Sequence, residues 1–189
     1  DSINNSSQRR NVTFIADVST AQIADLVVSQ DNAVADGATA NTRQVGVADA
    51  CCIEEAGQTV SVLADNGATV APTVTTQPDG TVEISVTSQT AGISAVTASI
   101  NSSSQSQNVT FVADVRTAKI ADLVVIKDGS EADGSTANTL RVRVTDAFGN
   151  ALNGQTVSVL AGHGATVAPT VITGQDGTVE ISVTSQTAG

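Results

Sequence analysis

The chain has 189 residues and a formal net charge of −11, with no Trp, Tyr or Met and only three Phe. A core without large aromatic residues must be built from small side chains that pack closely. The acidic charge argues against nucleic acid and anionic membranes as partners. No run of 18 apolar residues occurs, so the sequence predicts no membrane-spanning helix.

A long internal repeat dominates the sequence. Residues 11–92 align without a gap with residues 108–189, an offset of 97 residues, and about 58 of the 82 paired positions are identical. A fixed period of this kind indicates a repeat architecture, in which each period is one structural unit. Two full periods are slightly longer than the chain, which favours a window from a longer tandem array.

Residues 1–19 are interpreted as the C-terminal strand and linker of a preceding repeat, with the strand at residues 11–16. The first complete unit is predicted at residues 20–116. Its strands are expected at residues 23–28, 43–49, 59–64, 70–76, 81–87, 91–100 and 108–113, with a turn at residues 101–107. The dipeptide Asp79-Gly80 gives the strongest hairpin signal in the chain.

The second unit, residues 117–189, repeats five of these strands, at residues 120–125, 140–145, 156–161, 167–173 and 178–184. Short strands with frequent turn signals predict an all-β fold of tandem immunoglobulin-like antiparallel β-sandwiches, about seven strands each. Because the second unit lacks its last two strands, we expect it to have an open core and exposed sheet edges. Residues beyond the window, or the N-terminal strand of a neighbouring copy, would cover them.

Residue types that carry chemistry are scarce. His163 is the only histidine and takes the place of Asn66 in the first repeat, so a loop residue is favoured over a catalytic base and no enzyme is predicted. Cys51 and Cys52 are adjacent. This favours a free thiol pair or an intermolecular bridge over a disulfide framework or a zinc site.

Acidic residues recur near the predicted joins between units. Asp17, Asp25, Asp114 and Asp122 lie there, and carboxylates from two neighbouring domains would be able to share a calcium ion and stiffen a rod. The sequence has no contiguous calcium-binding loop, so turn and capping roles are the favoured interpretation. No other cofactor and no small-molecule substrate is predicted.

The second repeat carries a set of ordered motifs. They are ADG-x-x-ANT at residues 132–139, D-A-x-G-N at residues 146–150, GQTVSV at residues 154–159 and DGTVEISVTSQTAG at residues 176–189. On these motifs, essentially the whole chain resembles the bacterial Ig-like domains of the intimin/invasin family. One segment departs from the pattern: the first repeat has CCIEEA where the second has FGNALN, and so loses the Gly-Asn turn.

The resemblance implies structural stalk repeats of a bacterial cell-surface adhesin. Their partners would be neighbouring Ig-like domains. A terminal module outside this chain would bind a host-cell receptor. An anchor, also outside this chain, would attach the protein to the outer membrane, so the resemblance implies an extracellular location at the cell surface. Two alternatives belong to other classes. One is a self-assembling fibre subunit in which a neighbour's N-terminal strand completes the C-terminal sandwich. The other, a receptor- or carbohydrate-binding domain, is disfavoured by the lack of Trp and Tyr.

Overall fold

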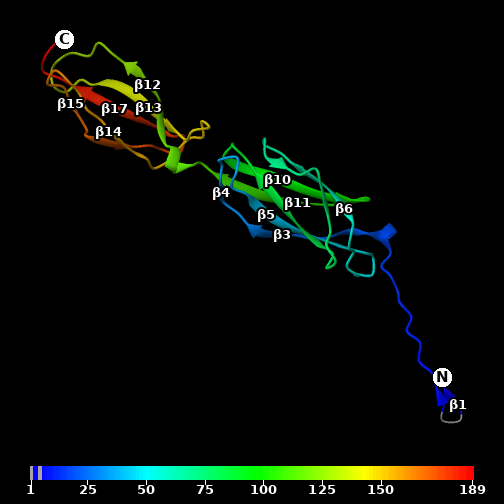
Figure 1. The fold of residues 1–189 in the computed structure, drawn as a ribbon. Helices are drawn as coiled ribbons and strands as arrows, with labels where there is room; N and C mark the ends of the chain where they lie inside the picture. The colour runs from blue at the N-terminus through cyan, green and yellow to red at the C-terminus, as the bar shows by residue number, and fades with distance from the viewer. Residues whose placement is uncertain (1, 4–5) are drawn as a thin grey trace.

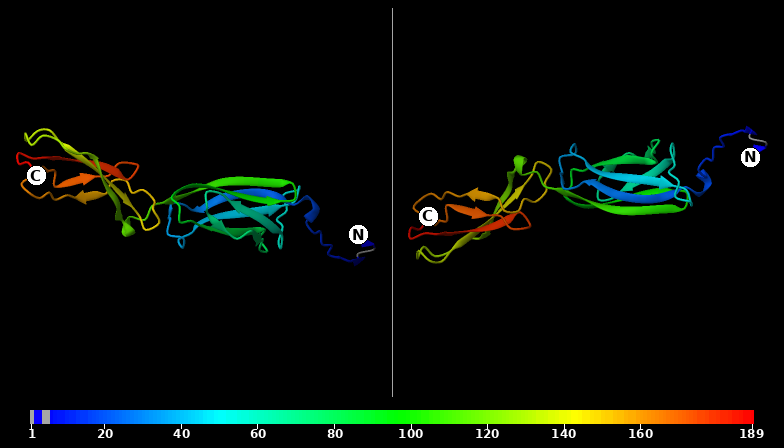
Figure 2. Two further views of the ribbon diagram at one scale, coloured as in Figure 1. Left: turned by 90° about the horizontal axis from the view of Figure 1, so that it is seen from above. Right: turned by 90° about the horizontal axis from the view of Figure 1, so that it is seen from below.

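The computed structural model describes residues 2–3 and 6–189, and almost all of its regular structure is β-strand. Two β-sandwiches follow one another end to end, and the N-terminal segment leaves the first sandwich at the end away from the second (Figures 1 and 2). The all-β immunoglobulin-like fold predicted from the sequence is confirmed. In the described part of the chain, no helix is both long and apolar enough to cross a membrane.

The first sandwich packs a four-stranded sheet against a five-stranded sheet. The first sheet has the order β3 (Gln22–Gln30), β5 (Asn41–Ala48), β9 (Thr81–Thr87), β7 (Thr69–Val70). The second has the order β4 (Ala33–Val34), β11 (Ser103–Val112), β10 (Gly92–Ile100), β6 (Thr59–Ala64), β8 (Thr73–Thr75). Neighbouring strands are antiparallel, except that β4 runs parallel to β11.

The core of the first sandwich follows from the alternation along its strands. In β9, Ile84 and Val86 are fully buried whereas Glu83 and Ser85 face solvent, as the period of two requires. Phe111 is the one aromatic side chain in this core. The other members are small aliphatic residues, which confirms the expectation of a core packed from small side chains.

The second sandwich is incomplete. Its larger sheet has the order β12 (Lys119–Lys127), β13 (Asn138–Thr145), β17 (Thr178–Thr184), β15 (Thr166–Val167), and its smaller sheet holds only β14 (Thr156–Ser158) and β16 (Thr170–Ile172). As expected, the core is open. Ile120 and Leu123 are 58% and 56% exposed, whereas the corresponding Ile23 and Leu26 are 4% and 3% exposed.

One predicted strand is wrong. Within residues 2–3 and 6–189, residues 11–16 have no strand partner, and Phe14 among them is 89% exposed. Almost the same sequence forms the end of β11, where β10 lies on one side and β4 on the other. A strand is stable only when its backbone N–H and C=O groups are paired. The N-terminal copy has no such neighbours; before it lie only β1 (Ser2–Ile3) and β2 (Ser6–Ser7), and after it the 3₁₀ turn η1 (Val18–Thr20).

Two predicted turns also differ. Asp79-Gly80 does form a turn, with Gly80 at φ +74°, but it connects β8 to β9, which belong to opposite sheets, so it makes no hairpin. The chain changes sheets between β7 and β8, next to Pro72. The predicted turn at residues 101–107 shrinks to two residues because β10 pairs with β11 from Ile100 and Ser103 onward.

The departure CCIEEA places an acid inside the first sandwich. Glu55 is 3% exposed, and its Oε1 has no hydrogen-bond partner among the described residues. Leu152 occupies the corresponding position in the second sandwich, also 3% exposed, and packs in its core. Burying a polar group without a partner costs about 1–3 kcal/mol.

We therefore expect Glu55→Leu to raise the free energy of unfolding of the first sandwich by about 1–3 kcal/mol. Urea unfolding, followed through amide signals of β5 and β9, measures the change. The matched control is Glu54→Ala, which puts the second repeat's residue at the exposed neighbouring position and should change stability by less than about 0.5 kcal/mol. A destabilised Glu55→Leu variant would contradict this account of the loop.

Candidate functional site

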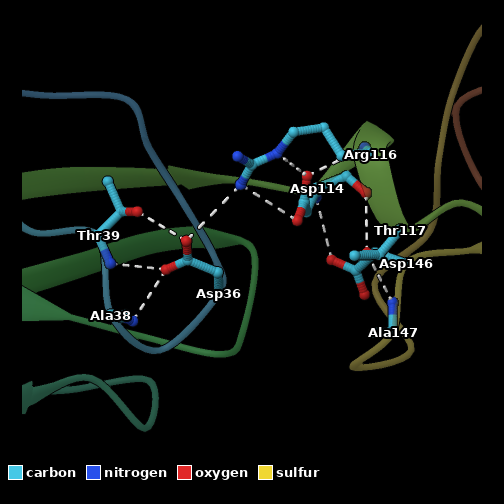
Figure 3. Close-up of polar contacts among 8 residues, drawn as sticks. All are labelled: Asp36, Ala38, Thr39, Asp114, Arg116, Thr117, Asp146 and Ala147. Carbon is cyan, nitrogen blue, oxygen red and sulfur yellow. Dashed lines mark hydrogen bonds and ion pairs between the residues drawn. The ribbon is translucent and has the colours of Figure 1, made fainter.

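The contacts between the two sandwiches start from a short turn in the linker. The 3₁₀ turn η2 (Val115–Thr117) connects β11 to β12. Asp114 caps it: its Oδ1 accepts the backbone N–H of Arg116 at 3.0 Å and the side-chain Nε–H of Arg116 at 2.9 Å. Thr117 Oγ1 in turn accepts the N–H of Ala147 at 3.1 Å (Figure 3). The linker is therefore bound to the second sandwich.

The buried carboxylate of Asp146 organises the loop that meets this turn. Its Oδ1 accepts the N–H groups of Phe148 and Asn150, both at 2.9 Å, and its Oδ2 accepts the N–H of Asp114 at 3.1 Å. Burial raises the pKa of the Asp146 carboxyl, but the hydrogen bonds to it, led by that from the Asn150 side chain, outweigh burial and lower its pKa overall. One carboxylate thus joins loop and linker into a single unit.

The side chain of Asn150 connects this loop to the first sandwich by two hydrogen bonds. Its Oδ1 accepts the backbone N–H of Ala91 at 2.8 Å, and its Nδ2 donates to the carbonyl of Gln89, also at 2.8 Å. Both belong to the connection between β9 and β10. The same Nδ2 donates to Asp146 Oδ2 at 2.8 Å, so the amide is held in place from its own side. A side-chain amide that pairs with both a backbone donor and a backbone acceptor fixes position and direction together.

A second, weaker link runs from Arg116 to Asp36. Arg116 Nη2 lies 3.8 Å from Asp36 Oδ2, and the Arg116 side chain is 70% exposed (Figure 3). Exposed ion pairs of this kind contribute little. Asp36 itself is held by the Thr39 hydroxyl and by the N–H groups of Thr39 and Ala38, and these bonds, the hydroxyl first, lower the pKa of Asp36 to about 2.

The first repeat has the same backbone frame without the crossing side chains. Asp49 accepts the N–H groups of Asp17, at 3.2 Å, and of Ile53, at 2.9 Å, as Asp146 does in the second repeat. Ile53 takes the place of Asn150, and Ser19 takes the place of Arg116. The two residues that reach a preceding sandwich are therefore present in only one of the two repeats.

The altered loop keeps its turn. Cys52 has φ +66°, and Gly149, at the corresponding position, has φ +85°. A side chain in this region is strained, and the Asp49 hydrogen bonds hold it there. Cys51 and Cys52 are exposed and free.

The calcium candidates are not brought together by these contacts. Asp17 and Asp114 cap the two 3₁₀ turns, whereas Asp25 and Asp122 are exposed on β3 and β12. Among residues 2–3 and 6–189, no group of three or more His, Cys, Asp or Glu side chains is arranged to hold a metal ion. Calcium binding stays a prediction.

His163 lies at one end of the second sandwich, and Asn150, which the sequence did not mark as a functional residue, lies at the other. His163 is exposed in a turn at φ +53°, and Asn66 has φ +52° at the equivalent position, so the two share one turn geometry. Asn150 lay within a quoted motif, yet nothing marked it as the crossing residue. Its partners are main-chain groups, which leave no pattern in the sequence.

The lowered pKa of Asp36 predicts a pH dependence. A carboxyl whose pKa falls from 3.8 to about 2 on folding stabilises the folded state fully above pH 3.8, and this contribution is lost as the pH falls toward about 2. We expect the difference in unfolding free energy between the wild type and Asp36→Asn to shrink over that window, as measured by urea unfolding. Thr39→Val, which removes the hydroxyl, should raise the folded-state pKa of Asp36 and so narrow the window from its low-pH end. A difference that stays constant down to pH 2 would contradict the assignment.

Comparison with known proteins gives consistent matches. The model of the bacterial Ig-like domain (group 1) family matches residues 23–112 and 120–189. The inverse autotransporter adhesin YeeJ of Escherichia coli strain K12 is 31% identical over 194 residues; the match covers 94% of this chain and 8% of YeeJ.

Solved structures are similar as well. InvD of Yersinia pseudotuberculosis matches with a TM-score of 0.58 at 20% identity, over 92% of this chain and 51% of that one, which is a likeness of fold. Invasin, an integrin-binding bacterial protein, matches with a TM-score of 0.46 at 29% identity, over 87% of this chain and 34% of that one. The two matched regions of the family model take in most of the sequence, so the chain belongs to the family of bacterial Ig-like domains (group 1).

Proposed function

We propose that this chain is a stalk segment of a bacterial cell-surface adhesin. It lies outside the cell and acts as a spacer that holds a separate receptor-binding module away from the outer membrane. Family membership and the likeness to an inverse autotransporter adhesin support the adhesin role. The chain spans 8% of that relative, so the anchor and the receptor-binding part are proposed to lie elsewhere in the protein.

The observation that carries the proposal is the pair of hydrogen bonds from Asn150 to the backbone of Gln89 and Ala91. A spacer must resist bending, and two sandwiches on a flexible tether would tumble independently. Here six residues separate the end of β11 from the start of β12, and half of them form η2. The short linker and the Asn150 contact together favour one preferred arrangement of the two sandwiches.

A fibre subunit is the second candidate. It is favoured by the open side of the second sandwich, where apolar residues such as Ile120 and Leu123 face solvent. In a fibre, each copy would close the open side of the next.

The spacer proposal predicts that the two sandwiches move as one body. ¹⁵N relaxation measurements should give the same overall correlation time for both in the wild type. Asn150→Ile, which copies the first repeat, removes both crossing hydrogen bonds, about 0.5–1.5 kcal/mol each, so the two correlation times should separate. Asn153→Ala, at an exposed position shortly after the same loop, is the control and should leave them equal. Independent motion already in the wild type would refute a stiff spacer.

A spacer also needs no receptor of its own. The purified 189-residue chain, labelled with a fluorophore at Cys51 or Cys52, should show no saturable binding to host-cell surfaces. Cys51→Ser and Cys52→Ser variants allow one site to be labelled at a time. Saturable binding that unlabelled chain competes away would replace the spacer role with a receptor-binding one.

A further inference from the structure

The basic residues of the second sandwich all lie on one face of its larger sheet. Val142 and Val144 are buried, so the arginines that alternate with them along β13 point outward. The lysines are at the two ends of β12, and their pairing with β13 places them on the same outer face. All four side chains are exposed, and they are the only Lys and Arg residues between positions 117 and 189: Lys119, Lys127, Arg141 and Arg143. We call these four residues the basic surface.

The carboxylates of the same sandwich do not neutralise the basic surface. Asp122 lies opposite Arg143, and Glu180 lies opposite Arg141. In the part of the chain that the structure describes, however, none of the four cations takes part in an ion pair. Four cations and two acids leave this face with an excess of positive charge, although the chain as a whole carries −11. The cations extend along β12 and β13 over roughly 20–25 Å.

The same face of the first sandwich keeps the acids and lacks the cations. Asp25 and Glu83 are exposed at the positions of Asp122 and Glu180. The positions of the four cations hold neutral residues: Gln22, Gln30, Gln44 and Gly46. A Cβ at Gly46 would lie only 2.6 Å from Asp25 Oδ1, so the Asp25 carboxylate occupies the space that the missing side chain leaves. This face therefore carries only negative charge.

A hollow beside Asp25 adds to the negative charge of this face. It has a volume of about 360 Å³, and its lining includes Asp25, Glu54 and Asp79. The backbone N–H of Thr81 and then its hydroxyl lower the pKa of Asp79, so this carboxyl is ionised at neutral pH. Glu54 is exposed, and the second repeat has an alanine in its place. We call Asp25, Glu54, Asp79 and Glu83 the acidic surface.

We propose that the basic surface of the second sandwich binds the acidic surface of the first sandwich of a second copy, which lies alongside. Surfaces of opposite charge attract, whereas any other approach of two copies brings carboxylates together. Each surface lies on a four-stranded sheet, and the two sheets have the same strand order. The contact therefore uses elements that are equally complete in both sandwiches.

The acidic surface has to come from a second copy because of how the two sandwiches are joined. They follow one another end to end, so their sheet faces point sideways and do not face each other (Figures 1 and 2). The short linker and the Asn150 hydrogen bonds oppose folding back. Single exposed ion pairs contribute little, so we expect a weak contact that depends on several charges together. It goes beyond the spacer role, because it would hold two spacers side by side with an offset of one sandwich.

The test mixes two variants of the full 189-residue chain, each of which keeps one surface. The first carries Asp25→Asn, Glu54→Ala and Glu83→Gln and presents only the basic surface. The second carries glutamine at all four positions of the basic surface, as the first repeat does at three of them, and presents only the acidic surface. With the first variant ¹⁵N-labelled, addition of the second at about 0.1 M salt should shift the amide signals of β12 and β13. At about 1 M salt the shifts should disappear, because charges are then screened over a few ångströms.

Two further changes in the labelled chain locate the contact. Arg141→Gln together with Arg143→Gln should weaken binding at least about tenfold, since half of the basic surface is lost. The matched control, Arg9→Ser with Arg10→Ser, removes the same number of cations from the N-terminal segment and should keep binding within about threefold.

Three results would overturn the proposal: no shift on mixing, shifts that centre on β14 and β16, or shifts that persist at high salt. An equal loss with the Arg9 and Arg10 changes would do the same. A sulfated polysaccharide is added in a separate titration. If it shifts the β12 and β13 signals and the partner chain does not, the basic surface binds a polyanion and not a second copy. None of these outcomes bears on the spacer role, which the correlation times of the two sandwiches test separately.

Discussion

A strand's need for hydrogen-bonding neighbours on its edges decides what each part of this chain becomes. The sequence NVTF occurs twice. At residues 108–111 it pairs with β10 along its whole length and, from Phe111 onward, with β4 as well, whereas at residues 11–14 it is unpaired among the described residues. The same constraint shortens β14 to three residues, because the later half of its counterpart β6 pairs with β10, which has no equivalent among the described residues of the second sandwich. Alternation of apolar and polar residues favours a strand, but the strand forms only where its backbone pairs with a neighbouring strand.

The joint between the sandwiches also depends on hydrogen bonds to backbone groups, but here a side-chain amide makes them. Asn150 meets an N–H and a C=O of the neighbouring sandwich much as another main chain would. Because its targets are backbone groups, the receiving side places little demand on side-chain identity, and residues 185–189 repeat the receiving sequence SQTAG. The first repeat has Ile53 and Ser19 at the positions of Asn150 and Arg116, so a sandwich placed before it would receive neither of the two crossing contacts.

The sequence predicted the fold well where one strand's own pattern decides the outcome. The 97-residue repeat, the bounds of β6, β9 and β17, and the open second core all follow from alternation and from the position of the repeat in the chain. It failed where distant groups decide. The partner of residues 11–16, the change of sheet between β7 and β8, and the role of Asn150 depend on segments far away in the sequence.

The altered loop of the first repeat shows why such a joint can vary without loss of the fold. Three of its substitutions are each unfavourable or neutral locally: Cys52 takes a left-handed backbone, Glu55 is buried with an unpaired oxygen, and Ile53 gives up the crossing amide. The loop keeps its course because the Asp49 carboxylate binds the N–H groups of Asp17, Cys51 and Ile53. The donors of these bonds are main-chain N–H groups. The bonds therefore persist when the side chains of the donor residues are exchanged, unless the new residue is proline. An aspartate thus fixes the shape of the loop, whereas the side chains around it determine whether the loop forms hydrogen bonds to the preceding sandwich.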